Sequence, residues 1–97
     1  MKSVLTDRIR DQLGNADLER TSRAAFAIID SIQNQPGGIL PGEAVGAITA
    51  AFVLTMEACR LPAHDAIGMA RNIMADANGR RPEFKAITDY IKEEVLK

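Results

Sequence analysis

The sequence predicts an all-α protein: a compact bundle of four to five helices with a central, Ala/Gly-rich apolar helix over residues 41–59. Apolar residues recur at helical spacing in five segments, and no segment shows the alternation typical of a strand. Gly and Pro mark the breaks between these segments. Fifteen alanines stand beside three Phe, one Tyr and no Trp, which suits closely packed helices. A chain of this length favours a single domain over residues 1–97.

The first two segments each carry one apolar stripe. Leu5, Ile9 and Leu13 repeat every four residues over about 3–13, and Gly14 can end that helix. The second helix is expected to begin after Asp17, a favourable N-cap residue, and to run to about residue 34. Its stripe has the spacing i, i+3, i+4, i+7: Ala25, Ile28, Ile29 and Ile32. A Gln-Pro-Gly-Gly sequence then breaks the helix.

The third segment is apolar on every side. Pro41 suits a first helical turn, and Glu43 lies near the positive end of the helix dipole. Ala44–Met56 contains no charge, and a helix of this kind is either buried centrally or spans a membrane. A span needs about 20 apolar residues. Because this run has thirteen, we expect a core helix. Gly46 and Ala50 are four apart, so another backbone can approach there.

The last two segments are also helical. The fourth begins near Pro62-Ala63 and ends at Asn78-Gly79. Its expected apolar face is Ala66, Ile67, Ala70, Ile73, Met74 and Ala77. The fifth begins at Pro82, followed by Glu83, which favours a helix N-terminus. Its stripe runs to the end of the sequence: Phe84, Ile87, Ile91 and Val95, with Lys92 and Lys97 suiting the C-terminal dipole.

Charge and cysteine content set the expected environment. Twelve basic and thirteen acidic side chains leave a net charge of −1, so no overall field attracts nucleic acid or an anionic membrane. A single cysteine excludes an internal disulfide and fits a reducing compartment. Charges at Asp7, Arg8 and Arg10 interrupt any apolar N-terminal run. We therefore expect no signal peptide and a cytoplasmic protein.

One neighbourhood holds residues that can carry chemistry. Cys59 and His64 lie five apart, beside Glu57 and Asp65, as a nucleophile pair or a zinc site shared across a dimer would require. A cysteine at the end of a buried helix more often acts as a small hydrophobe, and a His-Asp pair in a first turn suits capping. One Cys and one His also cannot complete a structural zinc site. We expect no catalytic residue, no metal and no cofactor.

The arginines are the favoured partner-binding residues. Arginine is frequent among the residues that dominate interfaces, and arginines near the helix ends could contact an acidic partner or a phosphate backbone. Its alternative role there is to complement helix C-terminal dipoles. The first choices lie between residues 60 and 81: Arg60, Arg71, Arg80 and Arg81. Two exposed arginines of the second segment come next: Arg20 and Arg23.

Small size and the lack of a catalytic constellation favour a non-enzymatic protein-interaction module. It would bind a larger protein complex and occlude or regulate it, as a monomer or a homodimer. Standalone helical domains of this kind occur among phage and mobile-element inhibitors of host defence systems. That comparison depends on size and class alone.

Two other classes stay open. Segments three and four, joined by Arg60-Leu61-Pro62-Ala63, have the outline of a helix-turn-helix nucleic-acid binder. A recognition helix presents polar and basic groups to bases, whereas segment four offers mainly His64, Asp65, Arg71 and Asn72. The near-neutral charge also disfavours nucleic acid. The other open class is a small structural or accessory subunit. We expect a protein partner, and neither nucleic acid nor a membrane.

Overall fold

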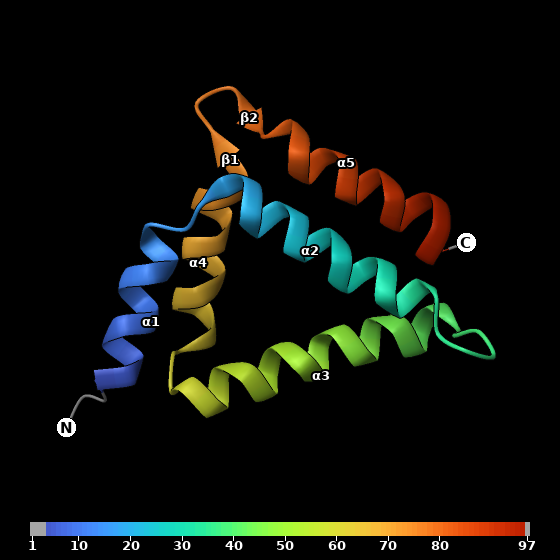
Figure 1. Ribbon diagram of the computed structural model, residues 1–97, viewed down its shortest axis with the longest axis horizontal. Coiled ribbons are helices and arrows are strands. Elements are labelled where there is room, and N and C mark those ends of the chain that lie inside the picture. Colours follow the sequence, from blue (N-terminus) through green and yellow to red (C-terminus); the bar gives the residue numbers. More distant parts are fainter. Residues whose placement is uncertain (1–3, 97) are drawn as a thin grey trace.

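The computed structural model describes residues 4–96, which form five α-helices, a two-stranded hairpin and a terminal π-helix (Figure 1). The helices are α1 (Val4–Gly14), α2 (Leu18–Gln33), α3 (Pro41–Cys59), α4 (Ala63–Met74) and α5 (Pro82–Tyr90). Strands β1 (Ala75–Asp76) and β2 (Gly79–Arg80) lie between α4 and α5, and the π-helix η1 (Ile91–Val95) continues α5. The predicted all-α bundle is confirmed. Residue 3 of the first expected helix and Lys97 lie outside the described residues.

Local sequence signals explain where the helices begin. The carboxylate of Asp17 accepts a hydrogen bond from the Arg20 backbone N–H at 2.8 Å, so Asp17 is the N-cap of α2 as predicted. Pro41 lies in the first turn of α3, and the Leu40 N–H donates to the Glu43 carboxylate at 2.9 Å. Each of these helix starts therefore has one backbone donor satisfied by a carboxylate.

The hairpin corrects the prediction that the chain has no strand. α4 ends at Met74, so Ala77 lies in the turn and not on the apolar face of α4. The Asn78 N–H donates to the Asp76 carboxylate at 2.8 Å, and Gly79 takes a positive φ of 105°. Strands of two residues are too short to show an alternating pattern, which is why periodicity missed them.

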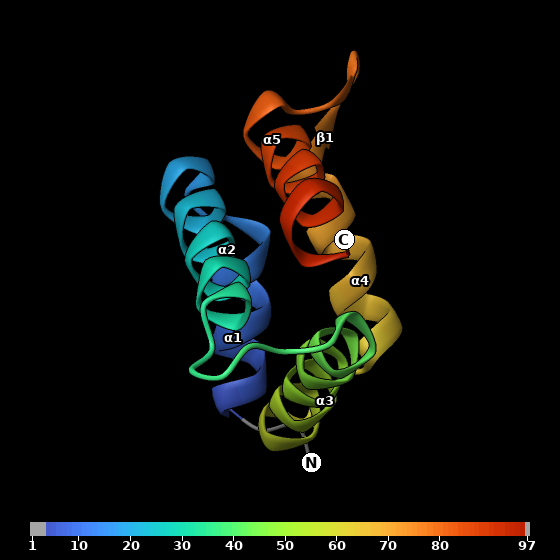
Figure 2. The same cartoon turned by 90° about the vertical axis from the view of Figure 1, so that its right-hand side faces the viewer.

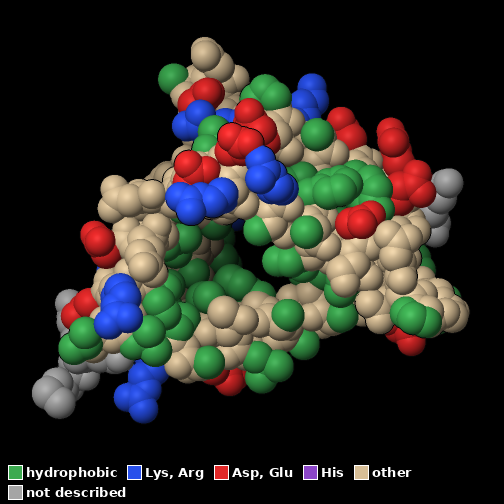
Figure 3. All heavy atoms as spheres, in the orientation of Figure 1, with side chains coloured by type: hydrophobic (Ala, Val, Ile, Leu, Met, Phe, Trp, Pro, Cys, Tyr) green, Lys and Arg blue, Asp and Glu red, His purple; other side chains and the backbone are tan. Residues whose placement is uncertain are grey.

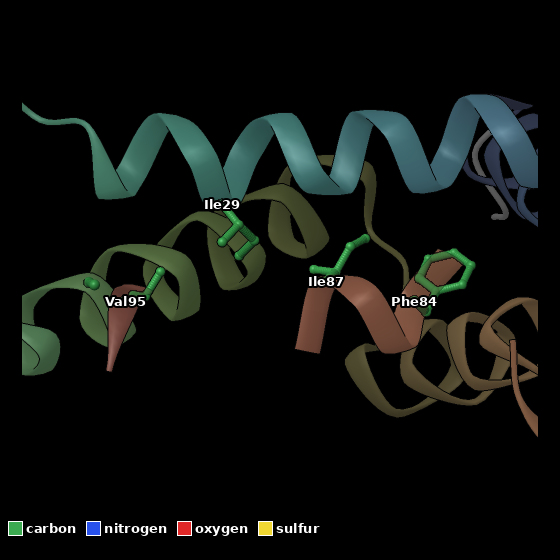
Figure 4. Packing of buried hydrophobic residues seen from close by; sticks show 5 residues of the cluster. Ile29, Phe84, Ile87 and Val95 are labelled. Atoms are coloured by element: carbon green, nitrogen blue, oxygen red, sulfur yellow. The ribbon is translucent and has the colours of Figure 1, made fainter. Parts of the chain in front are cut away.

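Buried side chains form two separate clusters. The first joins α2, the start of α3, α5 and η1: Ile29, Ala44, Phe84, Ile87 and Val95 (Figure 4). The second lies where α3 turns into α4 and meets α1: Cys59, Leu61 and Ala66. The predicted stripe of the fifth segment is confirmed at Phe84, Ile87 and Val95, which are all buried.

α3 occupies the predicted residues, but its expected central position is wrong. Its start joins the cluster of α2, α5 and η1 through Ala44, and the rest of the helix runs along one edge of the molecule (Figures 1 and 2). Only Ala44 and Cys59 are buried, and 11% of its most apolar 18-residue window is covered. α2 pairs with α5, and α4 packs beside α1, so no helix covers the outer side of α3. An uncharged apolar segment is stabilised by contacts that exclude water, but those contacts need not come from the same chain.

The arrangement leaves much surface for a small protein. The molecule measures 44 × 32 × 20 Å and exposes 7041 Å². A globular monomer of 10.5 kDa is expected to expose about 5,400 Å². Figure 3 shows a hollow between α2, α3 and α4 that is lined largely by apolar side chains. The helices therefore bury less apolar surface than their composition allows.

Replacing Tyr90 with Phe tests the link between α2 and the last residue of α5. The Tyr90 hydroxyl donates to the Asp30 carboxylate at 2.8 Å, and its ring packs on Phe26 with centroids 4.9 Å apart. This hydrogen bond, then burial and the charges of Asp30 and Glu94, raise the pKa of Tyr90 above 10.0. The stabilisation is complete below pH 10 and is lost as the pH rises through the raised folded-state pKa.

We expect Tyr90→Phe to lower the free energy of unfolding at pH 7 while the ring contact with Phe26 is kept. The difference from wild type should shrink above pH 10, because the ionised tyrosine can no longer donate. Urea titrations of both proteins from pH 7 to pH 11 measure it. A difference that is constant over this range would contradict the assigned hydrogen bond.

Candidate functional site

The outer side of α3 is a continuous apolar strip. Ile48, Phe52 and Met56 face the rest of the molecule and are partly buried, so helical periodicity points Ala50 directly away from it. We call this strip the α3 stripe and define it by five exposed residues: Gly46, Ala47, Ala50, Val53 and Leu54. Glu43 and Glu57 limit it at its two ends.

The stripe combines small residues with two exposed branched side chains. The exposed fraction is 65% for Leu54 and 44% for Val53, which is high for large aliphatic residues. A Cβ built on Gly46 meets no atom within 4 Å, so no neighbour within the chain requires glycine there. The result is a flat strip against which another backbone can pack closely.

The stripe ends beside Arg60, which was the first choice for partner contact. Arg60 follows the last residue of α3 with a left-handed φ of 55°, where glycine is usual. The Leu61 N–H donates to the Met56 carbonyl at 3.2 Å, which closes the helix end. Arg60 is exposed at the rim of a shallow groove of about 360 Å³ that also includes Val53 and Glu57. Of the predicted partner-binding residues, Arg60 therefore lies next to the α3 stripe.

The other chosen arginines do not form a common surface with Arg60. Arg20 and Arg23 are exposed on α2 and pair with Asp17, at 3.9 Å, and with Glu19. Arg71 is exposed on α4, and Arg80 lies in the hairpin with its guanidinium 3.5 Å from the Met74 sulfur. A guanidinium that already pairs with a carboxylate of its own chain is less free to pair with a carboxylate of a partner.

Arg81 holds the hairpin and the helix end together. Its Nε donates to the Ile73 carbonyl at 3.0 Å, and its backbone N–H donates to the Met74 carbonyl at 2.8 Å. Its guanidinium also lies 3.8 Å from the Asp76 carboxylate. The helix-end role weighed for these arginines thus fits Arg81 best.

Cys59 and His64 occupy different environments. The Cys59 thiol is 8% exposed in the second cluster, and its sulfur lies 3.7 Å from the Met56 carbonyl. The His64 side chain is 88% exposed, with Nε2 3.1 Å from the Asp65 carboxylate. A nucleophile pair needs the imidazole at the thiol, and a thiol that substrate can reach. Within residues 4–96, no group of three or more acidic, His or Cys side chains could hold a metal ion.

Periodicity cannot reveal the contacts that hold α1 beside α3 and α4. The Thr6 hydroxyl donates to the Cys59 carbonyl at 2.7 Å, and Arg10 pairs with Asp65 at 3.3 Å. These residues are more than 50 positions apart. The exposed α3 stripe is likewise not predicted from the sequence, and its signals in the sequence are the lack of charge in residues 44–56 and the Gly46–Ala50 spacing.

α3 also has the length and composition of a membrane-spanning helix. Its most apolar 18-residue window has a mean hydropathy of 1.3, as a membrane-spanning helix would. The core helix of a soluble protein can have the same length and hydropathy. One side of α3 contributes to both buried clusters, which is consistent with a soluble protein.

No family model, no curated protein and no solved structure matches this chain.

Arg60→Gly tests whether the left-handed backbone at Arg60 lowers the stability of the chain. A left-handed conformation costs a residue other than glycine roughly 1 kcal/mol, so we expect the glycine variant to be more stable by about that amount. Arg60→Ala keeps the backbone cost and removes the guanidinium, so it should be no more stable than wild type. Urea denaturation of the three proteins measures this. Equal stability of the two variants would show that the conformation carries no cost.

Proposed function

We propose that this chain is a non-enzymatic protein-interaction module that binds a larger protein complex through the α3 stripe and so occludes or regulates it. The observation that carries the proposal is the exposure of the uncharged segment 44–56 of α3, which a small soluble domain would normally bury. Exposed apolar strips bordered by polar residues mark protein-binding surfaces. Helix α3 has such borders in Glu43 and Glu57.

The surface area supports a protein partner. The chain exposes more than about 1,000 Å² beyond what is expected of a monomer of its mass. A stable protein interface covers about 800 Å² on each partner. The additional exposed surface of this chain is therefore comparable with one side of an interface of ordinary size.

Arg60 would act at the edge of this contact. Interfaces commonly combine an apolar centre with a polar rim in which arginine is frequent. Arg60 is exposed beside Val53 and Glu57, so it could meet an acidic group of the partner. Arg71 and Arg80 lie on other elements and would belong to a separate, weaker contact. A cytoplasmic location, and a role as a phage or mobile-element inhibitor of a host defence system, are parts of the same proposal.

Matched glutamate substitutions in a capture experiment test the proposal. Leu54 and Ile28 are both exposed aliphatic residues on helices, at 65% and 58%, but only Leu54 belongs to the stripe. We expect wild type and Ile28→Glu to retain the same partner from a lysate of the natural host. Leu54→Glu should lose at least nine-tenths of it, because a charge would be buried at the interface. A partner retained equally by both variants would contradict a role for the stripe.

A second candidate function is nucleic-acid binding through α4. Two observations favour it. Helices α3 and α4 meet at a sharp turn (Figure 1). One side of α4 is exposed at His64, Gly68, Arg71 and Asn72. That side carries one arginine, whereas affinity for duplex DNA depends on several phosphate contacts. The protein interaction is therefore the better-supported function.

A gel shift with a duplex DNA pool at 50 mM salt tests this second candidate. Binding should weaken steeply as the salt rises to 200 mM, and Arg71→Ala should weaken it further. Arg23→Ala, on the far element α2, is the matched control. If no complex forms at 50 mM salt, α4 is not a recognition helix.

A further inference from the structure

We propose that the partner on the α3 stripe is a second copy of this chain, which crosses the first α3 antiparallel about a two-fold axis at Ala50. The inference rests on the proposed function, because it concerns the same surface: a second copy covers the stripe of the free protein, and the larger complex of the proposed function would have to displace that copy. Three features favour a second copy: the thin core of the single chain, the self-complementary shape of the stripe, and its lack of charge.

The single chain has little core of its own. Among residues 4–96, no large side chain is fully buried, and the two buried clusters are small and separate. A chain in this condition needs a permanent partner, because an apolar strip left in water favours aggregation. A second copy is always present wherever the chain is made, and permanent homodimer interfaces are the more apolar class.

The order of residues along the stripe is complementary to itself. An antiparallel two-fold crossing at Ala50 brings Gly46 of one copy opposite Leu54 of the other. It also brings Ala47 opposite Val53. Small residues thus meet large ones on both sides of the axis, which lets the ridges of one helix enter the grooves of the other. Glycine at position 46, which no contact within the chain requires, gives Leu54 of the other copy a place to pack.

Charge also favours a second copy over a charged partner. No charged residue lies between Glu43 and Glu57, so the stripe has nothing to pair with an acidic or basic surface. Each glutamate lies seven residues from Ala50, about 10 Å along the helix axis, where crossed helices diverge and water screens them. Antiparallel helices also oppose their dipoles favourably. Because the contact is apolar with like charges at its rim, salt should strengthen it.

Light scattering after size-exclusion chromatography of the purified chain tests the dimer. At 50 μM we expect a mass of two chains in 0.1 M and in 0.5 M sodium chloride. Ala50→Arg should raise the dissociation constant at least a hundredfold and give a mass of one chain. Ala24→Arg, a matched substitution at an exposed alanine of α2, should remain a dimer. Circular dichroism of both variants confirms that they stay helical.

A cysteine placed at the axis tests the register. Ala50→Cys should form a covalent dimer under mild oxidation, because the two-fold crossing brings both copies of residue 50 together. Ala24→Cys is the control and should cross-link far less. Cys59 is buried, so the new thiol is the reactive one in each variant. Equal cross-linking of the two variants would overturn the proposed crossing.

The outcomes separate this inference from the proposed function. A one-chain mass for wild type at 50 μM overturns the dimer. If Leu54→Glu then still loses the captured host protein, the stripe binds a different protein and the proposed function stands. If Leu54→Glu loses nothing, both fail. Binding of wild-type chain to phosphatidylcholine vesicles in a flotation assay, lost in Ala50→Arg, would also overturn the dimer, because the stripe would then contact lipid.

Discussion

The fold depends on how α3 is held at its two ends. Ala44 near its start is buried in the cluster with Ile29 and Val95, whereas Cys59 at its end is buried with Leu61 and Ala66. The Thr6 hydroxyl satisfies the Cys59 carbonyl from α1, so the last turn of α3 is fixed by a contact across the molecule. Between these attachments only one side of the helix is covered, which leaves the α3 stripe in solvent.

This way of holding α3 accounts for the shape of the molecule. α2 with α5, and α1 with α4, form two pairs that α3 connects, so three helices surround a hollow instead of closing over a single core (Figures 1 and 3). Small residues contribute to this outcome, because alanine offers too little apolar surface to draw the pairs together. A larger side chain at Ala50 would add nothing within the chain, since that position faces away from both clusters.

Local signals predicted the helices well, and the position of α3 poorly. The N-cap at Asp17, the first turn at Pro41 and the stripe ending at Val95 depend on neighbours along the chain, so the sequence alone reveals them. The placement of α3 depends on pairings such as Thr6 with Cys59, which leave no periodic trace. The lack of charge in residues 44–56 indicates that this segment needs apolar contacts. It does not indicate whether the same chain or another chain provides them. The site was missed for the same reason, although the Gly46–Ala50 spacing pointed to a close helix contact.

The glycine at position 46 has an energetic cost that packing within the chain does not explain. Glycine inside a helix costs about 0.5–1 kcal/mol relative to alanine, and the open space around position 46 would accept a methyl group. Packing within the chain therefore gives no reason for a glycine there. Gly68 on α4 is equally open but lies among the polar residues His64 and Asn72, so it is part of no apolar strip. At position 46 the missing side chain leaves a hollow within the α3 stripe, which is the shape that a crossing helix fills.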